Sequence, residues 1–410
     1  MAGRDVAVVA FAQTKHAAAD SGLSETEMLQ PVIAEVLGQA GLACAQIGFT
    51  CSGSCDYLAG APFSFVSALD AVGAWPPISE SHVEMDAAWA LYEAWVRLQH
   101  GDIDSALVYG FGKSTQGDLR EIMTLQLDPY YLAPLGLDQV SLAALQARAY
   151  LEASGRTERD LADVAARSLR AAAANPYAVQ AEALTVDEVL AQPHAVTPLR
   201  PADCAPITDG AAAIVLAAGD LARRLRERPA WIRGIDHRIE AHYPGVRDLT
   251  QSASTAQAAR AASAGSSGSL GSLGSLGSAG AVGSVRAAGA VEAVGSVGSV
   301  RTVGAVGAAG SVRAVGSVGA AGAARPDVAE LHAQFSHEEL ILRDALGLAG
   351  DVLVNPSGGP LGANPVMATG LIRIGEAAAR IFDGSAACAL AHAASGPCLQ
   401  HNLVCVLEGE

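Results

Sequence analysis

Short apolar strands alternate with alanine-rich helices along most of the chain, and this alternation restricts its fold more than any other feature. The stretches "DVAVVAFA" from Asp5, "SALVYGFG" from Ser105 and "DGAAAIVLAA" (209–218) predict strands. Between them, "ETEMLQPVIAEVLGQAG" and "DAAWALYEAWVRLQHG" predict helices that end at Gly41 and Gly101. Because strands of this apolar kind must be covered on both faces, the pattern predicts an α/β fold with helices on both sides of the strands.

The length of the chain indicates how many lobes it has, and its net charge restricts which molecules it can bind. The chain has 410 residues, which favours two lobes, and its net charge of −16 argues against nucleic acid as a partner. No apolar run approaches the ~20 residues of a membrane span. The N-terminal stretch "MAGRDVAVVAFAQTK" lacks the apolar region of a signal peptide. We therefore expect a soluble cytoplasmic protein with no membrane span.

The seven cysteines are dispersed along the chain, which favours reduced thiols. Cys51 and Cys55 have the spacing C-x3-C, but no second pair of ligands follows at a suitable spacing. Since a structural zinc ion needs four ligands, we expect no metal site. Cys398 and Cys405 belong to a predicted last strand, where packing explains them.

A glycine repeat interrupts the chain. From 265 to 325 every third residue is glycine, except at five positions: Arg286, Glu292, Arg301, Arg313 and Arg325. A collagen triple helix needs glycine at every third position without exception, and the five charged residues break this rule. Collagen is also rich in proline, but no proline occurs between Pro244 and Pro326. We expect residues 263–324 to be a flexible, low-complexity surface insertion, with an interaction tail as the alternative.

The stretch "GFGKST", which begins at Gly110, looks at first like a phosphate-binding loop. That motif requires a glycine five residues before the Gly-Lys pair, and this position is Leu107. We therefore do not expect it to bind phosphate.

Five other stretches carry a more specific pattern. "VNPSGGPLGANPVMATGLIRIGEAA", from Val354, has the glycines of a tight loop that leads into a helix. The others are "GDIDSALVYG", "ITDGAAAIVLA", "ELHAQFSH" and "PCLQHNLVCVLEG". Together and in this order they resemble the motifs of the thiolase superfamily, in particular the sterol-carrier and lipid-transfer type that is close to steroid side-chain aldolase subunits. The resemblance covers the whole chain outside the insertion.

The resemblance implies a thiolase fold, in which two similar halves form a five-layered α-β-α-β-α core. Both "DGAAAIVLAA" and "CLQHNLVCVLEG" look like the closing strand of a half. We expect an N-terminal half at 1–222, with a helical loop region at about 118–200, and a C-terminal half at 223–410.

The chain departs from thiolases where the chemistry takes place. Alignment of "HVEMDAAWALYEA" with the start of the long central helix places Glu84 where thiolases have their nucleophilic cysteine. Asn364 replaces the histidine of the Gly-His-Pro motif, and Ala333 and Gln334 replace the Asp and Cys of the His-Asp-Cys-Phe box. Thiolysis through a cysteine nucleophile is therefore not expected.

The remaining polar residues still suit a thioester. His332 falls where the family places a group that binds the thioester oxygen, and Asn364 can also donate a hydrogen bond there. Glu84, at a predicted helix N-terminus, is a candidate base, and His401 is its candidate acid partner. Each of the four also has a structural alternative, as a helix cap, a buried histidine or a loop-stabilising amide. The candidate ligand-binding glycines are Gly358, Gly359 and Gly370.

The resemblance implies action on a lipid or steroid acyl-CoA thioester, with no tightly bound cofactor. The leading hypothesis is retro-aldol cleavage of a 3-hydroxyacyl-CoA, which needs the oxygen-binding group but no cysteine. The resemblance also implies an OB-fold partner of the DUF35 type and a dimer with a copy of this chain or with a second thiolase-like chain. Two alternatives stay open: a non-catalytic lipid-transfer or scaffold subunit, and an acetyl-CoA acetyltransferase.

Overall fold

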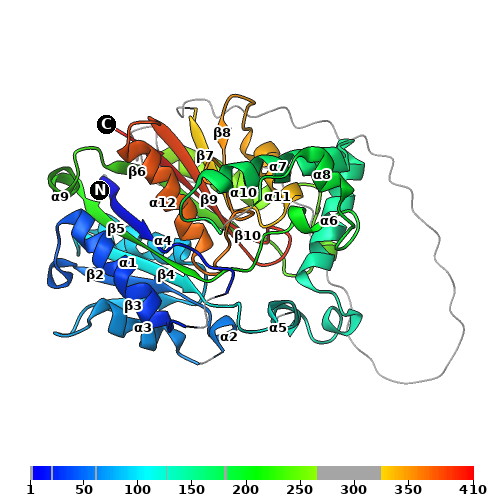
Figure 1. Ribbon diagram of the computed structural model, residues 1–410. Coiled ribbons are helices and arrows are strands. Elements are labelled where there is room, and N and C mark those ends of the chain that lie inside the picture. The colour runs from blue at the N-terminus through cyan, green and yellow to red at the C-terminus, as the bar shows by residue number, and fades with distance from the viewer. Residues whose placement is uncertain (1–2, 20–21, 61, 126, 180–181, 266–324) are drawn as a thin grey trace, which may run out of the picture.

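The computed structural model describes residues 3–19, 22–60, 62–125, 127–179, 182–265 and 325–410. The strands of this part form one hydrogen-bonded array in the order β3-β2-β4-β5-β1-β6-β10-β9-β7-β8 (Figure 1). Those of the first half are β1 (Val6–Gln13), β2 (Phe49–Gly53), β3 (Glu80–Val83), β4 (Ser105–Gly112) and β5 (Gly210–Ala218). Those of the second half are β6 (Ala230–Ile239), β7 (Val328–Leu331), β8 (Leu353–Val354), β9 (Cys388–Ser395) and β10 (His401–Glu408).

The two sets of five strands repeat one topology. In each set the order is third, second, fourth, fifth, first, counted along the chain. In each set the first and fourth strands run antiparallel to the fifth, while the second runs parallel to the third and fourth. The sets join where β1 pairs with β6 at Ala7–Trp231 and Val8–Ala230. The predicted pair of similar halves is therefore confirmed.

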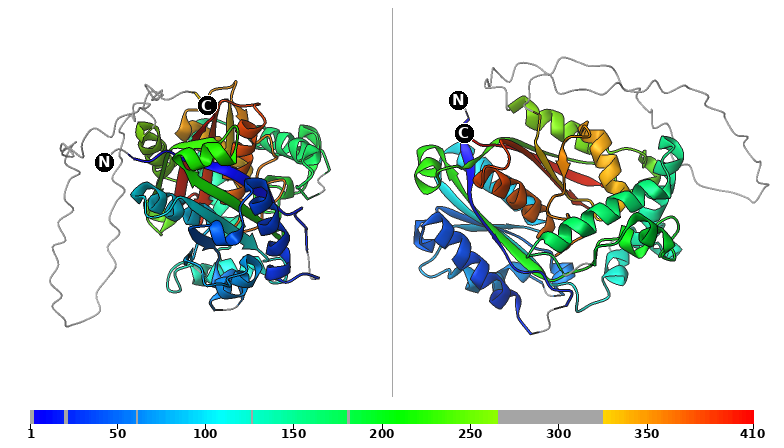
Figure 2. Two further views of the ribbon diagram at one scale, coloured as in Figure 1. Left: turned by 90° about the vertical axis from the view of Figure 1, so that its left-hand side faces the viewer. Right: turned by 45° about the horizontal axis from the view of Figure 1, so that its top comes forward.

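Helices cover both faces of each set and produce the five predicted layers (Figure 2). The outer layer of the first half contains α1 (Glu25–Ala40), α3 (Ser64–Val72) and α9 (Gly219–Leu225). The central layer contains α4 (Ala87–His100) and α12 (Thr369–Phe382). The outer layer of the second half contains α10 (Ala253–Gly265) and α11 (Ser336–Leu346).

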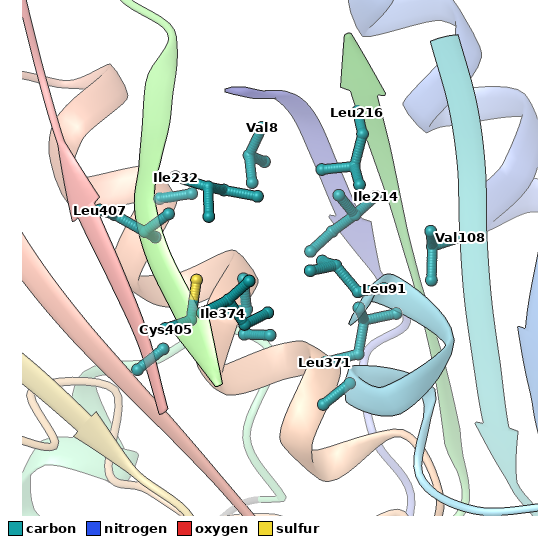
Figure 3. Packing of buried hydrophobic residues seen from close by; sticks show 14 of the residues in the cluster. Val8, Leu91, Val108, Ile214, Leu216, Ile232, Leu371, Ile374, Cys405 and Leu407 are labelled. Carbon is teal, nitrogen blue, oxygen red and sulfur yellow. The ribbon is translucent and has the colours of Figure 1, made fainter. Parts of the chain in front are cut away.

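The central layer is held by alternate residues of the strands. In β5, Ile214 and Leu216 face α4 and α12, whereas Val215 faces the outer layer, as the two-residue period of a strand requires. Figure 3 shows Leu91 of α4 and Leu371 of α12 among these inward-facing side chains. Burial of each such side chain contributes about 1.5–3 kcal/mol. The two central helices therefore fix the halves against each other.

The helix ends follow the sequence signals. Ser24 and Glu27 form a capping box at the start of α1, and α1 and α4 end at Gly41 and Gly101, both in the left-handed conformation. A helical region lies between β4 and β5: α5 (Leu119–Leu125), α6 (Gln139–Ser154), α7 (Glu158–Ala174) and α8 (Val186–Ala191). A short helix, α2 (Asp56–Ala59), follows β2. None of the helices in the described ranges is long and apolar enough to cross a membrane.

The predicted insertion at 263–324 begins three residues too early, because α10 continues through Gly265. Residues 266–324, on which the rest of this prediction falls, lie outside the described part of the chain.

Deleting residues 266–324, with a short Gly-Ser linker from Gly265 to Arg325, is expected to leave the melting temperature within about 2–4 °C, or ~1 kcal/mol. The reason is composition, since glycine-, serine- and alanine-rich sequence has little apolar surface to offset its ordering entropy. Thermal melts of both proteins measure this. A matched deletion that also removes Ala258 and Ala262, which are buried in the core, should melt clearly lower. Insoluble protein after the first deletion would contradict the expectation.

Candidate active site

The N-termini of the two central helices meet at one carboxylate, Asp86. It is the N-cap of α4, where Oδ1 accepts a hydrogen bond from the backbone N–H of Ala88 at 2.9 Å. It also accepts hydrogen bonds from the first turn of α12, at 2.8 Å from Gly370 N and 3.2 Å from Leu371 N. A carboxylate at a helix N-terminus is favoured by the helix dipole. Asp86 therefore links a helix of the first half to a helix of the second.

Burial controls the titration of Asp86. Its side chain is 1% exposed, and burial raises its pKa to about 7, against the opposing effect of the three backbone N–H groups. A Cβ atom at Gly370 would lie 2.5 Å from Oδ1 of Asp86 and 2.7 Å from Cβ of Ala393. The close approach of Asp86 thus explains why glycine occupies position 370. A role of Gly370 in ligand binding stays a prediction.

Glu84 does not start the central helix, because Asp86 does. It is exposed at the end of β3, where its Oε1 accepts a hydrogen bond from Asp56 N, at the start of α2, at 2.6 Å. The expected position at the N-terminus of α4 was wrong by two residues, since Asp86 supplies the cap. Glu84 remains open to solvent, and its role as a base stays a prediction.

His332 directly follows β7 and is held as a neutral donor. Its Nδ1 accepts a hydrogen bond from the backbone N–H of Ala394 at 3.2 Å, which leaves the proton on Nε2. Burial, together with His392 and Arg373, lowers the pKa of His332 well below its usual value. The Nε2 atom lies 3.4 Å from the side-chain amide nitrogen of Gln334, which is itself a donor and does not accept the Nε2 proton. A neutral imidazole whose N–H points along one direction suits a developing negative oxygen.

A small cavity lies beside this donor. Its volume is about 10 Å³, which is room for roughly one water molecule. Its wall includes Gln139, Gln334, Phe335, Glu338, Ala394 and Cys398. Two of these residues, Gln334 and Ala394, are the ones that contact the His332 ring. The cavity is therefore one residue removed from the His332 ring, which does not itself belong to its wall.

Asn364 and the neighbouring glycines shape the loop that leads into α12. The Asn364 side chain accepts a hydrogen bond from the hydroxyl of Thr369 at 2.8 Å, within its own loop. Gly358 and Gly359 have φ values of +94° and +61°, which favour glycine. A Cβ at Gly358 would lie 2.7 Å from Ala172 of α7. These contacts explain the loop's shape, and the predicted ligand contacts stay predictions.

His401 lies at the start of β10 in a cluster of aromatic rings. Its Nε2 lies 3.2 Å from the indole N–H of Trp89 and 3.0 Å from Nδ1 of His237. Burial and the neighbouring His237 lower its pKa to about 4. The structure does not bring His401 into hydrogen-bond contact with Glu84, His332 or Asn364. Because His401 is neutral above a pH of about 4, it lacks the extra proton that an acid partner of Glu84 would have to give.

A buried ion pair between Arg373 and Glu330 contacts the glycine loop at Ser357. Nη1 of Arg373, in α12, lies 2.6 Å from Oε2 of Glu330, in β7, and 2.6 Å from the Ser357 hydroxyl. Both charged side chains are at most 4% exposed. The Ser357 hydroxyl and backbone N–H also donate to Glu330. This network ties the strand, the loop and the helix together.

The chain is similar to known proteins both in sequence and in structure. No protein-family model matches it. The chain is 31% identical over 161 residues to an acetyl-CoA acetyltransferase of Methanothermobacter thermautotrophicus, which covers 38% of this chain and 42% of the relative. It is 35% identical over 108 residues to the 17-hydroxy-3-oxo-4-pregnene-20-carboxyl-CoA lyase of Mycobacterium tuberculosis, which covers 26% and 28%. The chain thus spans less than half the length of these curated relatives.

The solved structures cover the whole chain. An Ltp2-ChsH2(DUF35) aldolase matches with a TM-score of 0.73 and 18% identity over 100% of this chain and 98% of that chain. The acetyl-CoA acetyltransferase of Bacillus anthracis matches with a TM-score of 0.70 and 14% identity over 100% of both chains. The chain therefore has the thiolase fold that its motifs predicted.

In this chain with a thiolase fold, no cysteine stands in the three positions directly before the central helix α4. The residues that lead into it are Glu84, Met85 and Asp86. Among the described residues, no group of three or more His, Cys, Asp or Glu side chains is arranged to hold a metal ion.

Sequence reasoning about this thiolase-like protein missed two carboxylates, Asp86 and Glu338. An N-cap signal was present for Asp86, since an aspartate directly precedes the helix "AAWALYEAW". Glu338 stands in the first turn of α11, where acidic residues are common for dipole reasons alone. No pattern in the sequence indicated that either side chain is buried.

Proposed function

We propose that this protein cleaves the C2–C3 bond of a 3-hydroxyacyl-CoA by a retro-aldol reaction. The observation that carries the proposal is the neutral, buried His332, with its proton on Nε2, in a thiolase fold without a cysteine at the start of α4. Such a donor stabilises a negative thioester oxygen, and it does not require a covalent intermediate.

The reaction balances with two proton transfers. A base, for which Glu84 is the candidate, takes the proton of the C3 hydroxyl. The C2–C3 bonding electrons move into the thioester, and C3 leaves as an aldehyde or ketone. The enolate oxygen is met by Nε2–H of His332, and Asn364 is a second candidate donor. Protonation at C2 then gives the shortened acyl-CoA.

The comparisons support this reaction class. One similar protein is named as a lyase of a steroid-derived CoA thioester, and one similar structure is an aldolase that contains a DUF35 protein. We therefore propose a lipid or steroid acyl chain as substrate and a DUF35-type OB-fold protein as partner. We also propose that the protein forms a dimer, either with a second copy of this chain or with a related thiolase-like chain. Coenzyme A enters as part of the substrate, and we propose no tightly bound cofactor.

A non-catalytic subunit is the second candidate. The observation in its favour is the cavity beside His332, whose volume of about 10 Å³ is far smaller than an acyl group. In that case the chain supports a partner whose own site is complete. An acetyltransferase, the activity for which two similar proteins are named, is less well supported because a nucleophile is absent at α4.

The test is to purify the chain alone and together with an OB-fold protein of the DUF35 type. Each sample is incubated with a 3-hydroxyacyl-CoA, and the carbonyl product and the shortened acyl-CoA are quantified. Equal amounts of both products support the retro-aldol proposal. No cleavage by either sample, with retained acyl-CoA binding, supports the non-catalytic subunit, and thiolysis of an acetoacetyl thioester by free CoA supports the acetyltransferase.

Replacing Glu84 by glutamine is expected to reduce the turnover of the 3-hydroxyacyl-CoA at least tens-fold, because a general base typically contributes ~10²–10⁴-fold. The variant should stay folded, since the amide oxygen can still accept the hydrogen bond from Asp56 N. The exposed Glu227→Gln is the matched control and should keep full activity. Near-normal turnover of Glu84→Gln would move the base to another residue or to a partner chain.

A further inference from the structure

Glu338 is a buried carboxylate in the first turn of α11 with one oxygen left for a ligand. Its Oε2 accepts hydrogen bonds from two backbone N–H groups, Gln334 at 2.8 Å and Phe335 at 3.3 Å. Its side chain is 5% exposed and belongs to the wall of the cavity beside His332. Within the described residues, Oε1 accepts no hydrogen bond. The free oxygen is therefore available to whatever occupies the cavity.

The position of Glu338 relative to His332 is fixed by Gln334. The backbone N–H of Gln334 binds Glu338, and its side-chain amide lies 3.4 Å from Nε2 of His332. One residue thus contacts both groups, and it shares the wall of the cavity with Glu338, whereas His332 does not belong to that wall.

The surroundings of Glu338 favour its protonated form. Burial raises its pKa to about 7, although the two backbone N–H groups oppose the rise. The other titratable groups nearby are the Cys204 and Cys398 thiols, whose pKa values burial raises to about 12, and the neutral His332 and His337. Arg247 reaches this region only through the carbonyl oxygens of Pro397 and Cys398. Since Oε2 is already used as an acceptor, the proton of the neutral carboxyl belongs on Oε1.

We propose that Glu338 donates the proton that C2 of the enolate receives after the carbon–carbon bond breaks. This inference rests on the proposed retro-aldol function. In the enolate, the oxygen bound by His332 is separated from C2 by one carbon atom, so the donor for C2 must lie beside His332. The proton moves from Oε1 to C2, the enolate electrons form the new C–H bond, and the resulting carboxylate regains a proton from water. No oxidant or other co-reactant is needed.

Glu338→Gln keeps the acceptor for the two backbone N–H groups and removes the transferable proton. It is expected to lower turnover by about 10²-fold or more, while the protein stays folded and binds acyl-CoA. A general acid must be protonated, so the wild-type rate should fall as pH rises through about 7. This fall should be absent in Glu338→Gln. In D₂O the wild-type product should carry deuterium at C2 in one configuration, and the variant product should lose this selectivity.

The matched control is Asp203→Asn. Asp203 is also a buried carboxylate whose pKa is raised by burial, but it binds the Ser336 hydroxyl and lies outside the cavity wall. Its turnover and pH profile should match those of the wild type. If Glu338→Gln does not fold, Glu338→Asp serves instead and should show a lower rate with a displaced pH limb.

The outcomes separate the two proposals. Wild-type protein that cleaves no 3-hydroxyacyl-CoA, alone or with the OB-fold protein, overturns the proposed function and this inference with it. Wild-type protein that cleaves the substrate, together with a Glu338 variant of unchanged rate and pH profile, overturns the role of Glu338 alone.

Discussion

His332→Ala is expected to reduce turnover of a 3-hydroxyacyl-CoA by about 10²–10³-fold, the usual cost of losing one donor to a developing oxyanion. The Nε2 proton is fixed because Nδ1 is occupied by the backbone N–H of Ala394. The donor is therefore in place before negative charge appears on the thioester oxygen. The loss should fall mainly on kcat, since the charge is present only in the transition state and the intermediate.

The measurement compares kcat and KM of wild type, His332→Ala and His332→Asn, each purified with the OB-fold protein. Asparagine retains an N–H donor and should restore part of the rate. His242→Ala, at an exposed histidine, is the matched control. His401→Asn should have a smaller effect, because His401 contacts Trp89 and His237 and not the cavity. Near-normal kcat in His332→Ala would place the oxygen-binding group elsewhere.

Arg373→Met is expected to lower the free energy of unfolding by about 3–5 kcal/mol, which is the cost of leaving one member of a buried ion pair without its partner. Without Arg373, Glu330 keeps only the hydrogen bonds from Ser357 and stays fully buried, where the neighbouring Glu376 also disfavours its charge. The glycine loop that follows β8 should loosen at the same time, because Arg373 also donates to Ser357.

Denaturant unfolding of the whole chain measures this loss. Arg223→Met breaks an ion pair with Glu410 in which both side chains are 46% exposed, and solvent screens an exposed pair of this kind so that it contributes little to stability. The double variant Arg373→Met, Glu330→Leu removes both charges and should recover a large part of the stability. A loss of less than 1 kcal/mol in Arg373→Met would show that the pair is not needed to hold the loop.

The fold was predictable because each local pattern agrees with the global arrangement. The apolar run of β5 and the glycine after α4 specify a buried strand and a helix end by themselves. The order of the five motifs then specified the two halves. The boundary between α10 and the glycine repeat was less accurate, since alanine and serine suit the last turn of a helix as well as a low-complexity segment.

The candidate site was predictable only in part. His332 was predicted because it stands in a recognisable box, and the structure gives it a buried, neutral environment. Asp86 was missed because its hydrogen bonds to Gly370 and Leu371 join residues almost 300 positions apart. Glu338 was missed because its burial depends on the turn between β9 and β10, which forms the other side of the cavity. Contacts of this range leave no periodic signal in one sequence.

The carboxylate of Asp86 also bears on how such a site changes over time. In a thiolase, the start of the central helix carries the nucleophile, so that position serves chemistry. Here an internal negative charge already satisfies the first turns of both α4 and α12, two residues further along. The attachment of one half to the other therefore does not depend on which side chain occupies position 84. A chain built in this way keeps its two halves joined whichever side chain stands at position 84, so that position is open to substitution without loss of the architecture.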